Sequence, residues 1–345
     1  MYNDTYPIKR KEEVNSTDSE FVSLLQGRRQ EQWRSLLERT GLHPGAPAQL
    51  TLLIWDGEEL AATASRDGNI LKYIAVDPAH QGEDLTASLM TQLRQEAFSR
   101  EIRHLFLYTK PGHQQTFRSL FFYPVACTQQ VLLMENRENG AADFVSSLAA
   151  PRRSGTIGAA VMNCNPFTKG HRYLIEQAAR RCDWLYVFVL SEEQRQFPAA
   201  HRLRLVQEGT ADLPNVTVHP TGPYLISSAT FPSYFLKEPS AASQAQCQLD
   251  IEIFSRYFVP AFGITHRFVG EEPFSPITAQ YNEALCDLLP RSGVQVEVLP
   301  RLTQNGTAIS ASAVRALLTQ GKAEPLRALV PECTYQYLCR HYDLK

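Results

Sequence analysis

The sequence of 345 residues contains no long apolar run. A typical apolar run of this sequence, "WLYVFVL" at 184–190, falls far short of the ~20 residues that a membrane-spanning helix needs. The polar start, "MYNDTYPIKRKEEVNSTDSE", lacks the apolar middle of a signal peptide. We therefore expect a cytoplasmic protein without a membrane segment.

The sequence also has no large excess of positive or negative charge. Lys and Arg together number 34 and Asp and Glu 36, so that the net charge at pH 7 is −2. Domains that bind nucleic acids usually carry a strongly basic face. This balance predicts that no nucleic acid is a partner.

The seven cysteines lack the spacing of a metal site. No two of them form a Cys-x-x-Cys pair, and none clusters with histidine as in zinc proteins. We therefore expect no protein-bound metal, and an odd count without a secretory signal indicates reduced thiols. Cys164 has two interpretations, a nucleophile or a small buried residue at a strand end, and the second is favoured.

The hydrophobic pattern that is present divides the chain into two halves, as its length predicts. Asp56-Gly57 and Asp67-Gly68 are strong hairpin signals, so residues 50–76 predict a three-stranded meander. Residues 1–140 are predicted to form an α+β domain. Its further elements are a helix at 84–99 with an apolar face of Leu85, Leu89, Met90, Leu93 and Ala97, a strand at 104–110, a helix at 114–122 and a strand at 129–135.

The second half has the pattern of an α/β protein. Residues 141–155 lose hydrophobic periodicity and predict a linker. Residues 156–345 alternate continuous apolar runs with helical patterns, which is typical of a doubly wound parallel sheet that binds ligands at the carboxyl ends of its strands. The expected strands are "TIGAAVMNC", "WLYVFVL", "NVTVH", "THRFVG" and "QVEVLPRL", and the expected helices cover 170–181, 200–209, 244–259 and 310–320.

The stretch "NCNPFTKGH", residues 163–171, stands directly after the first of these strands. Thr168 is a good helix N-cap, which puts His171 at the third helical position. Gly170 lets an incoming group approach the backbone. Free amide groups and the helix dipole favour an anion at this point, and His171 can donate a hydrogen bond to it. Taken alone, His171 would more often cap its neighbours or cover the loop, but the surrounding pattern favours a phosphate site.

A second motif, "ISASAVR", occupies residues 309–315. Ser310 and Ser312 open a helix, and Arg315 lies one turn beyond Ser312 on the same face. The planar guanidinium group suits phosphate oxygens. Alone, this pattern is that of a capped surface helix, whereas together with the first motif it predicts a second phosphate clamp.

Both motifs resemble signatures of the nucleotidyltransferase superfamily, with a Rossmann-like fold: a Gly-x-Phe-Asp-Pro loop followed by His/Thr-x-Gly-His, and Ile-Ser-x-Ser/Thr-x-x-Arg. Asn165 replaces the usual aspartate, which indicates a specialised branch. With "SSATFPSYFLK" at 227–237 and "LVPECTYQYL" at 329–338, the whole chain resembles the citrate lyase ligase family.

That resemblance implies an enzyme that activates acetate with ATP as acetyl-adenylate. The acetyl group would then pass to the thiol of the phosphoribosyl-dephospho-coenzyme A group on the acyl carrier subunit of citrate lyase, with release of AMP and diphosphate. His171 would contact the α-phosphate, with Thr168 beside it as the second catalytic residue, and Mg²⁺ would be carried by ATP. The residues expected to bind or surround the nucleotide are Asn163, Asn165, Lys169, Gly170, Ser310, Ser312 and Arg315.

The N-terminal half resembles the GCN5-related acetyltransferase (GNAT) fold. Its turn at 81–86 corresponds to the pyrophosphate loop of that fold, but Asp84 and Thr86 stand in place of glycines, which argues against tight binding of acetyl-coenzyme A. The domain would then hold the carrier subunit or its coenzyme A-like arm, or have a structural role. Two other functions stay open: adenylyl transfer to a mononucleotide or phosphopantetheine-like acceptor, and acetyl-coenzyme A-dependent N-acetylation by the first domain.

Overall fold

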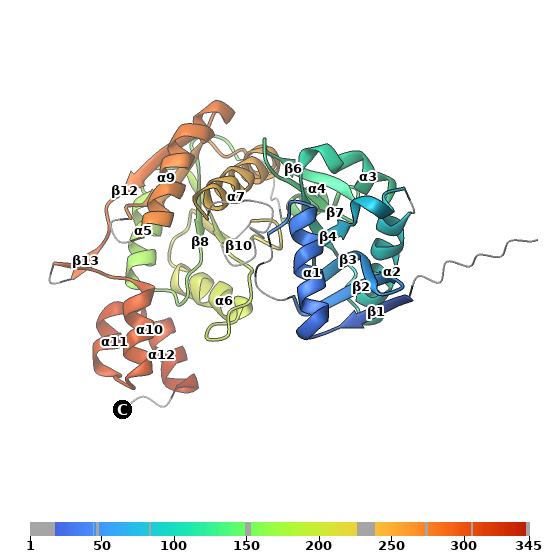
Figure 1. Ribbon diagram of the computed structural model, residues 1–345. Helices are drawn as coiled ribbons and strands as arrows, with labels where there is room; N and C mark the ends of the chain where they lie inside the picture. The colour runs from blue at the N-terminus through green and yellow to red at the C-terminus, as the bar shows by residue number, and fades with distance from the viewer. Residues whose placement is uncertain are drawn as a thin grey trace, which may run out of the picture. The chain divides into compact units, whose positions relative to one another are not determined.

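The computed structural model describes residues 18–43, 45, 48–82, 84–148, 153–225, 239–272, 275–304 and 306–342. The stretch 227–237 and Glu83, both used above, lie outside these ranges. The described chain divides into two compact units (Figure 1). Residues 18–108 belong to the first unit, and the parallel sheet with its helices belongs to the second.

Antiparallel strands form the centre of the first unit. Strands β2, β3 and β4 make the predicted meander, and Gly57 and Gly68 adopt the positive φ of +59° and +57° that the two tight turns require. Helix α2 buries the five apolar side chains that predicted it. The elements are β1 (Asp18–Val22), α1 (Gly27–Arg39), β2 (Leu50–Asp56), β3 (Glu59–Asp67), β4 (Ile70–Val76), η1 (Pro78–His80), α2 (Leu85–Ser99) and β5 (Phe106–Thr109).

Strand β1 and helix α1 have no counterpart among the predicted elements. Strand β1 pairs with β2 and keeps mostly exposed side chains, so it shows no apolar alternation. Helix α1 is highly charged and buries only Trp33, Leu36 and Leu37 among its residues. Strand β1 therefore lacks the apolar alternation that predicts a strand, whereas α1 has the helical spacing i, i+3 and i+4 in three apolar residues only.

The segment after β5 contributes η2 (Pro111–His113), α3 (Gln114–Ser119), β6 (Tyr123–Cys127), β7 (Leu132–Glu135) and α4 (Gly140–Leu148). The sheet has the order β1-β2-β3-β4-β5-β7-β6. Helix α4 covers the first half of the linker expected at 141–155. Two of its apolar residues, Ala141 and Val145, are buried. The compact units divide between residues 108 and 122, and the domain bounds 1–140 and 156–345 stay a prediction.

The five strands predicted in the second half form one parallel sheet with the order β10-β9-β8-β11-β12, which confirms the α/β fold class. Its strands are β8 (Ile157–Met162), β9 (Trp184–Val189), β10 (Val216–Pro220), β11 (His266–Gly270) and β12 (Gln295–Leu299). The helices between them are α5 (Lys169–Ala179), α6 (Ala199–Gly209), α7 (Pro239–Ile253), a π-helical turn (Phe254–Phe258), α8 (Val259–Phe262), α9 (Pro276–Leu288) and η4 (Leu289–Ser292).

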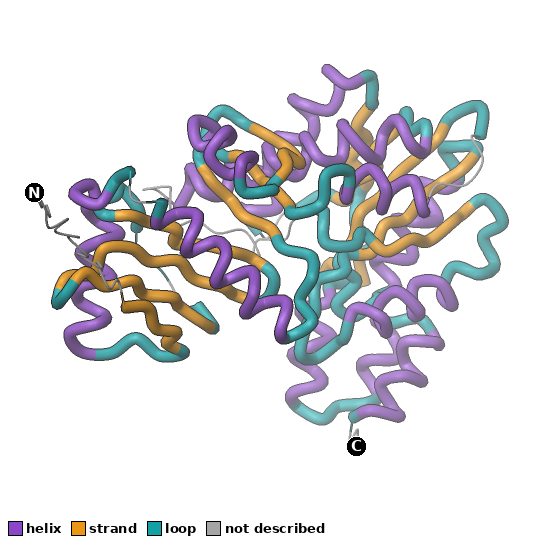
Figure 2. The backbone as a smooth tube through the Cα atoms, turned by 90° about the vertical axis from the view of Figure 1, so that its right-hand side faces the viewer, coloured by secondary structure: helices purple, strands orange, loops and turns teal. Residues whose placement is uncertain are grey.

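Both faces of the parallel sheet are covered, which explains its continuous apolar runs. Along β9, Leu185 and Val187 pack in the apolar cluster that contains side chains of α5 and α6. Tyr186, between them, points to the opposite face, where its ring centroid lies 4.7 Å from that of Phe262. Figure 2 shows helices on both sides of these strands.

Three helices end the chain: α10 (Ala311–Thr319), α11 (Glu324–Leu329) and α12 (Glu332–His341). They lie together, drawn in red in Figure 1, and follow the short hairpin β13 (Thr303–Gln304) and β14 (Thr307–Ala308). Helices α10 and α12 correspond to the predicted helix 310–320 and to the closing segment 329–338, whereas α9 has no predicted counterpart. In the ranges described, no helix combines the length and apolar character that crossing a membrane requires.

Candidate active site

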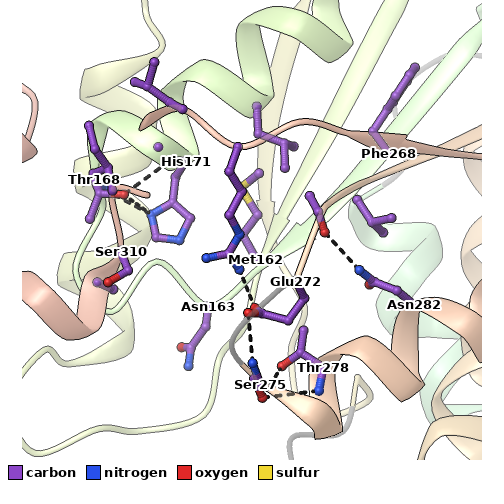
Figure 3. A pocket seen from close by; sticks show the side chains of 18 of the residues that line it. Met162, Asn163, Thr168, His171, Phe268, Glu272, Ser275, Thr278, Asn282 and Ser310 are labelled. Atoms are coloured by element: carbon purple, nitrogen blue, oxygen red, sulfur yellow. Dashed lines mark hydrogen bonds and ion pairs between the residues drawn. The ribbon is translucent and has the colours of Figure 1, made fainter. Parts of the chain in front are cut away.

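A cavity of about 590 Å³ opens at the carboxyl ends of β8 and β11, within the second unit (Figure 3). This is the edge at which parallel sheets bind ligands. The cavity is lined by residues of both motifs, so the starts of α5 and α10 face a common space. The predicted site residues among them are Asn163, Thr168, Gly170, His171, Ser310 and Ser312.

Helix α5 begins with a reciprocal pair of hydrogen bonds, a capping box. Oγ1 of Thr168 accepts from the backbone N–H of His171 at 3.3 Å, and Nδ1 of His171 accepts from the backbone N–H of Thr168 at 3.1 Å. An imidazole whose Nδ1 accepts a hydrogen bond carries its proton on Nε2 when neutral. His171 therefore presents an Nε2–H donor on the cavity wall, and Thr168, which is only 1% exposed, positions the ring.

The protonation state of this histidine follows from its surroundings. Burial of the ring lowers the pKa of His171 to about 4, and the positive charge of Arg301 contributes in the same direction. The imidazole is therefore neutral at pH 7. It can stabilise negative charge on a ligand by donating a hydrogen bond, without transferring a proton.

Gly170 brings the two motifs together. A Cβ atom at this position would lie 2.8 Å from the carbonyl oxygen of Ile309, a distance that forces one of the two segments to move. Ile309 directly precedes Ser310, whose Oγ caps α10 by accepting from the backbone N–H of Ala313 at 3.1 Å. Both helix starts can thus contribute donors to one ligand because position 170 has no side chain.

Three predicted site residues do not line the cavity. Arg315 donates from Nη1 to the carbonyl oxygen of Asn165 at 2.5 Å and from Nη2 to Oγ of Ser312 at 3.1 Å, so it connects α10 to the loop that follows β8. Lys169 turns away, and its Nζ donates to the carbonyl oxygen of Arg327 at 3.0 Å. Asn165 takes part through its backbone, while its own Oδ1 is buried and accepts no hydrogen bond from the part of the chain described here.

Asn163 is held by a buried arginine that the motifs did not include. Arg202, fully buried, donates from Nη1 to the backbone oxygen of Asn163 at 2.7 Å and to its Oδ1 at 2.6 Å. The side-chain nitrogen of Asn163 is then the atom that can donate to a ligand in the cavity. Cys164 is also fully buried, and burial raises the pKa of its thiol, which supports the interpretation as a buried residue over that of a nucleophile.

Comparison with known proteins identifies the family to which this site belongs. A family model for the citrate lyase ligase C-terminal domain matches residues 157–338, the region that contains both motifs. The chain belongs to the citrate lyase ligase family. The resemblance inferred from the two motifs is therefore confirmed.

Members of the citrate lyase ligase family match along most of the chain, including the N-terminal unit. The [citrate [pro-3S]-lyase] ligase of Escherichia coli K12 is 40% identical over 309 residues, which cover 88% of each chain. The ligase of the same name from Klebsiella pneumoniae is 40% identical over 299 residues, 85% of this chain and 87% of its own length. That of Haemophilus influenzae is 38% identical over 290 residues, 82% of this chain and 87% of its own.

In this member of the citrate lyase ligase family, the cavity has a second polar wall that the motifs did not predict. It is formed by the loop after β11 and by α9, where Ser275 caps the helix by accepting from the backbone N–H of Thr278 at 3.3 Å. Asn282 donates to the carbonyl oxygen of Gly270 at 2.9 Å (Figure 3). The signal in the sequence is the polar stretch "GEEPFS" after "THRFV", which stands at a strand end as 163–171 does.

The cavity wall also carries charge of both signs. Arg301, directly beyond β12, lines the cavity and forms an ion pair with Glu272, which also lines it. Within the described ranges, no three His, Cys, Asp or Glu side chains are placed to hold a metal ion together. The donors on the cavity wall are hydroxyl, amide, imidazole and guanidinium groups, a set that suits phosphate and carboxylate oxygens.

Proposed function

We propose that this protein is an AMP-forming ligase that uses ATP to activate acetate. It transfers the acetyl group to the thiol of the phosphoribosyl-dephospho-coenzyme A group on the acyl carrier subunit of citrate lyase. The names of its relatives, ligases of [citrate [pro-3S]-lyase], support this acceptor. The observation that carries the chemistry is the common cavity at the starts of α5 and α10, with the Nε2–H donor of His171 on its wall.

In the first step, an oxygen of acetate attacks the α-phosphorus of ATP. The bond between that phosphorus and the oxygen that bridges to the β-phosphate breaks, and diphosphate leaves as acetyl-adenylate forms. Negative charge develops on the oxygens of the α-phosphate, where His171 donates its hydrogen bond. Catalysis of this kind depends on positioning and on fixed donors rather than on proton transfer by the protein.

In the second step, the sulfur of the prosthetic group attacks the acetyl carbon. A carbon–sulfur bond forms, the carbon–oxygen bond to AMP breaks, and the thiol proton passes to solvent. The products are the acetylated carrier and AMP. The neutral His171 keeps its role here, because the leaving AMP carries the same phosphate oxygens.

The remaining motif residues divide into ligands and supports. We assign Asn163, Ser310, Ser312 and the amide of Gly170 to the phosphate oxygens. Thr168 positions His171, and Arg315 positions Ser312 and the backbone of Asn165 through the hydrogen bonds described above. Lys169 supports the start of α5 from α11.

We also propose that Mg²⁺ enters with ATP, whose phosphate oxygens supply most of its ligands, since Mg²⁺ usually keeps water and phosphate oxygens around it. The partners are acetate and the carrier subunit, and the place of action is the cytoplasm. No nucleic acid or membrane takes part in the proposed reaction.

Mass spectrometry of the citrate lyase carrier subunit tests this function. After incubation with this protein, ATP and acetate, the carrier should gain one acetyl group, and AMP and diphosphate should appear in equal amounts. Omission of acetate should abolish both. An adenylyl group on the carrier or on a nucleotide acceptor would instead identify a plain nucleotidyltransferase, and acetylation from acetyl-coenzyme A without ATP would identify an acetyltransferase.

A further inference from the structure

Apart from the ion pair of Arg301 and Glu272, a further charged side chain lines the cavity without a role in the mechanism above. Arg267 lies in the middle of β11 and is only 3% exposed, yet it lines the cavity. Its Nε and Nη1 atoms are buried and have no hydrogen-bond partner in the described part of the chain. Because an unpaired buried donor of a charged group is costly, such an arrangement points to a ligand that supplies the missing acceptor.

The position of Arg267 in the sheet separates it from the phosphate-binding motifs. Its neighbour Phe268 packs in the apolar cluster on the α5 side of the sheet. Successive residues of a strand point to opposite faces, so Arg267 points to the other side, and its guanidinium carbon lies 4.7 Å from the ring centre of Phe254. The cavity therefore reaches from the start of α5 across the strand ends to Arg267.

The groups around Arg267 shape a small subsite. Tyr281 lines the same cavity, interacts with Arg267 and donates to the buried carboxylate of Asp250 at 2.5 Å. This hydrogen bond fixes the tyrosine beside the guanidinium group. Val161 and Val269 add apolar surface to the cavity wall. A fork of N–H donors next to apolar side chains matches a short aliphatic carboxylate better than a bulky polar ligand.

We propose that Arg267 binds the carboxylate of acetate and presents it to the α-phosphate. One carboxylate oxygen accepts from the Nε or Nη1 group, the other attacks phosphorus, and the methyl group packs against the valines. In-line attack requires the nucleophile and the diphosphate on opposite sides of the α-phosphorus. An acetate site across the strand ends from the helix starts satisfies this requirement. The inference rests on the proposed ligase function.

The test compares the dependence of the first step on each substrate. Acetate-dependent exchange of diphosphate with ATP is measured for the wild type and for Arg267→Met and Arg267→Lys. We expect Arg267→Met to raise the KM for acetate about 10- to 100-fold, the usual effect of losing a hydrogen bond to a charged group. The KM for ATP should stay within about twofold, and Arg267→Lys should show a smaller rise, because an ammonium group keeps the charge but loses the fork. Arg181→Gln, which removes a half-exposed arginine that faces Glu297 at 3.8 Å, is the matched control.

Each outcome decides one question. A folded Arg267→Met protein with an unchanged KM for acetate refutes the subsite, and so does a rise in the KM for ATP alone, which would make Arg267 a phosphate ligand. A loss of kcat with both KM values unchanged would show a merely structural role. If Arg267→Met does not fold, the same split is measured with Arg267→Lys. A wild type without acetate-dependent exchange refutes the proposed function itself, independently of any variant.

Discussion

Both units of the chain contain a turn that leads into a helix after a strand, and the two turns differ in detail. Helix α5 begins at Thr168, which has extended φ and ψ of −118° and 166° and caps the helix with its side chain. Helix α2 begins after Asp84, which has a positive φ of +53° and makes no capping hydrogen bond with its side chain. The first turn exposes a neutral donor, His171, at the third helical position, whereas the second places the carboxylate of Asp84 at the N-cap.

The contrast shows that the backbone arrangement of strand, turn and helix does not by itself determine which ligand binds there. Backbone amides and the helix dipole favour an anion at both turns. At α5, the side chains add donors and leave room for the approach of a second motif. At α2, a like charge opposes the anion. We therefore assign ATP to the second unit, and the predictions below test that assignment from the largest expected effect to the smallest.

Replacement of the histidine should cause the largest loss. His171→Ala removes the Nε2–H donor and half of the capping box, so we expect acetate-dependent exchange of diphosphate with ATP to fall by about 10²–10³, as for other single oxyanion donors. His113→Ala, at an exposed position, is the control. Near-normal exchange in a folded His171→Ala protein would remove this residue from the mechanism.

The second largest loss of activity is expected for a variant that pushes the two motifs apart. A methyl group at Gly170 meets the carbonyl oxygen of Ile309, so Gly170→Ala should push α5 and α10 apart and reduce exchange by about 10²-fold, the effect of a displacement near 1 Å. Gly112→Ala adds the same methyl group in open space and should leave activity unchanged. Equal activities of the two variants would show that the contact between the motifs is not needed.

The comparison of the two turns also shows which parts of the site a sequence can reveal. The start of α5 was predictable, because Thr168, Gly170 and His171 combine a capping signal with an apolar strand before and an apolar stripe after them. The start of α10 was predictable from its capping residue Ser310 and the apolar stripe that follows, since a short polar hairpin rather than an apolar strand precedes it. Local rules of capping and periodicity act within about ten residues, and both motifs are that short.

The rest of the cavity depends on contacts distant in sequence. Helix α9 escaped prediction because Thr278, Tyr281 and Asn282 face the cavity as polar residues and interrupt its apolar stripe. Arg202 and Arg267 look like ordinary charged residues of a helix and a strand, and only the packing of the sheet buries them. The supporting roles that we propose for Lys169 and Arg315 could not be predicted from the motifs either, since their partners lie 158 and 150 residues away.

A smaller effect is expected for the residue that connects the second motif to the first loop. Arg315→Lys keeps the charge but cannot donate at once to Asn165 and Ser312, so we expect the KM for ATP to rise about 3- to 10-fold, as for one lost hydrogen bond. Arg340→Lys, on the exposed end of α12, is the matched control. An unchanged KM in Arg315→Lys would contradict a role of this connection in nucleotide binding.

The pKa of His171 predicts a pH dependence of stability. Burial lowers the pKa of the folded protein's imidazole to about 4, whereas the unfolded chain has the ordinary value of 6.5. Between these values the unfolded state binds the proton and the folded state does not, so the free energy of unfolding decreases as the pH falls from 6.5 to 4. His171→Gln should show a flatter dependence in urea titrations across this range, and identical slopes would indicate an imidazole that titrates normally.

The smallest effect should be that of acetyl-coenzyme A on the intact protein. A ligand stabilises the folded state in proportion to the logarithm of its concentration relative to Kd, so a tightly bound nucleotide raises the Tm and a weakly bound one does not. We expect ATP to raise the Tm and acetyl-coenzyme A at the same concentration to leave it almost unchanged, because Asp84 opposes a pyrophosphate at the start of α2. Asp84→Gly removes that charge and suits the positive φ of this position, and should therefore increase the response to acetyl-coenzyme A alone. A strong response of the wild type to acetyl-coenzyme A would overturn the distinction between the two turns and return the acetyltransferase reaction to consideration.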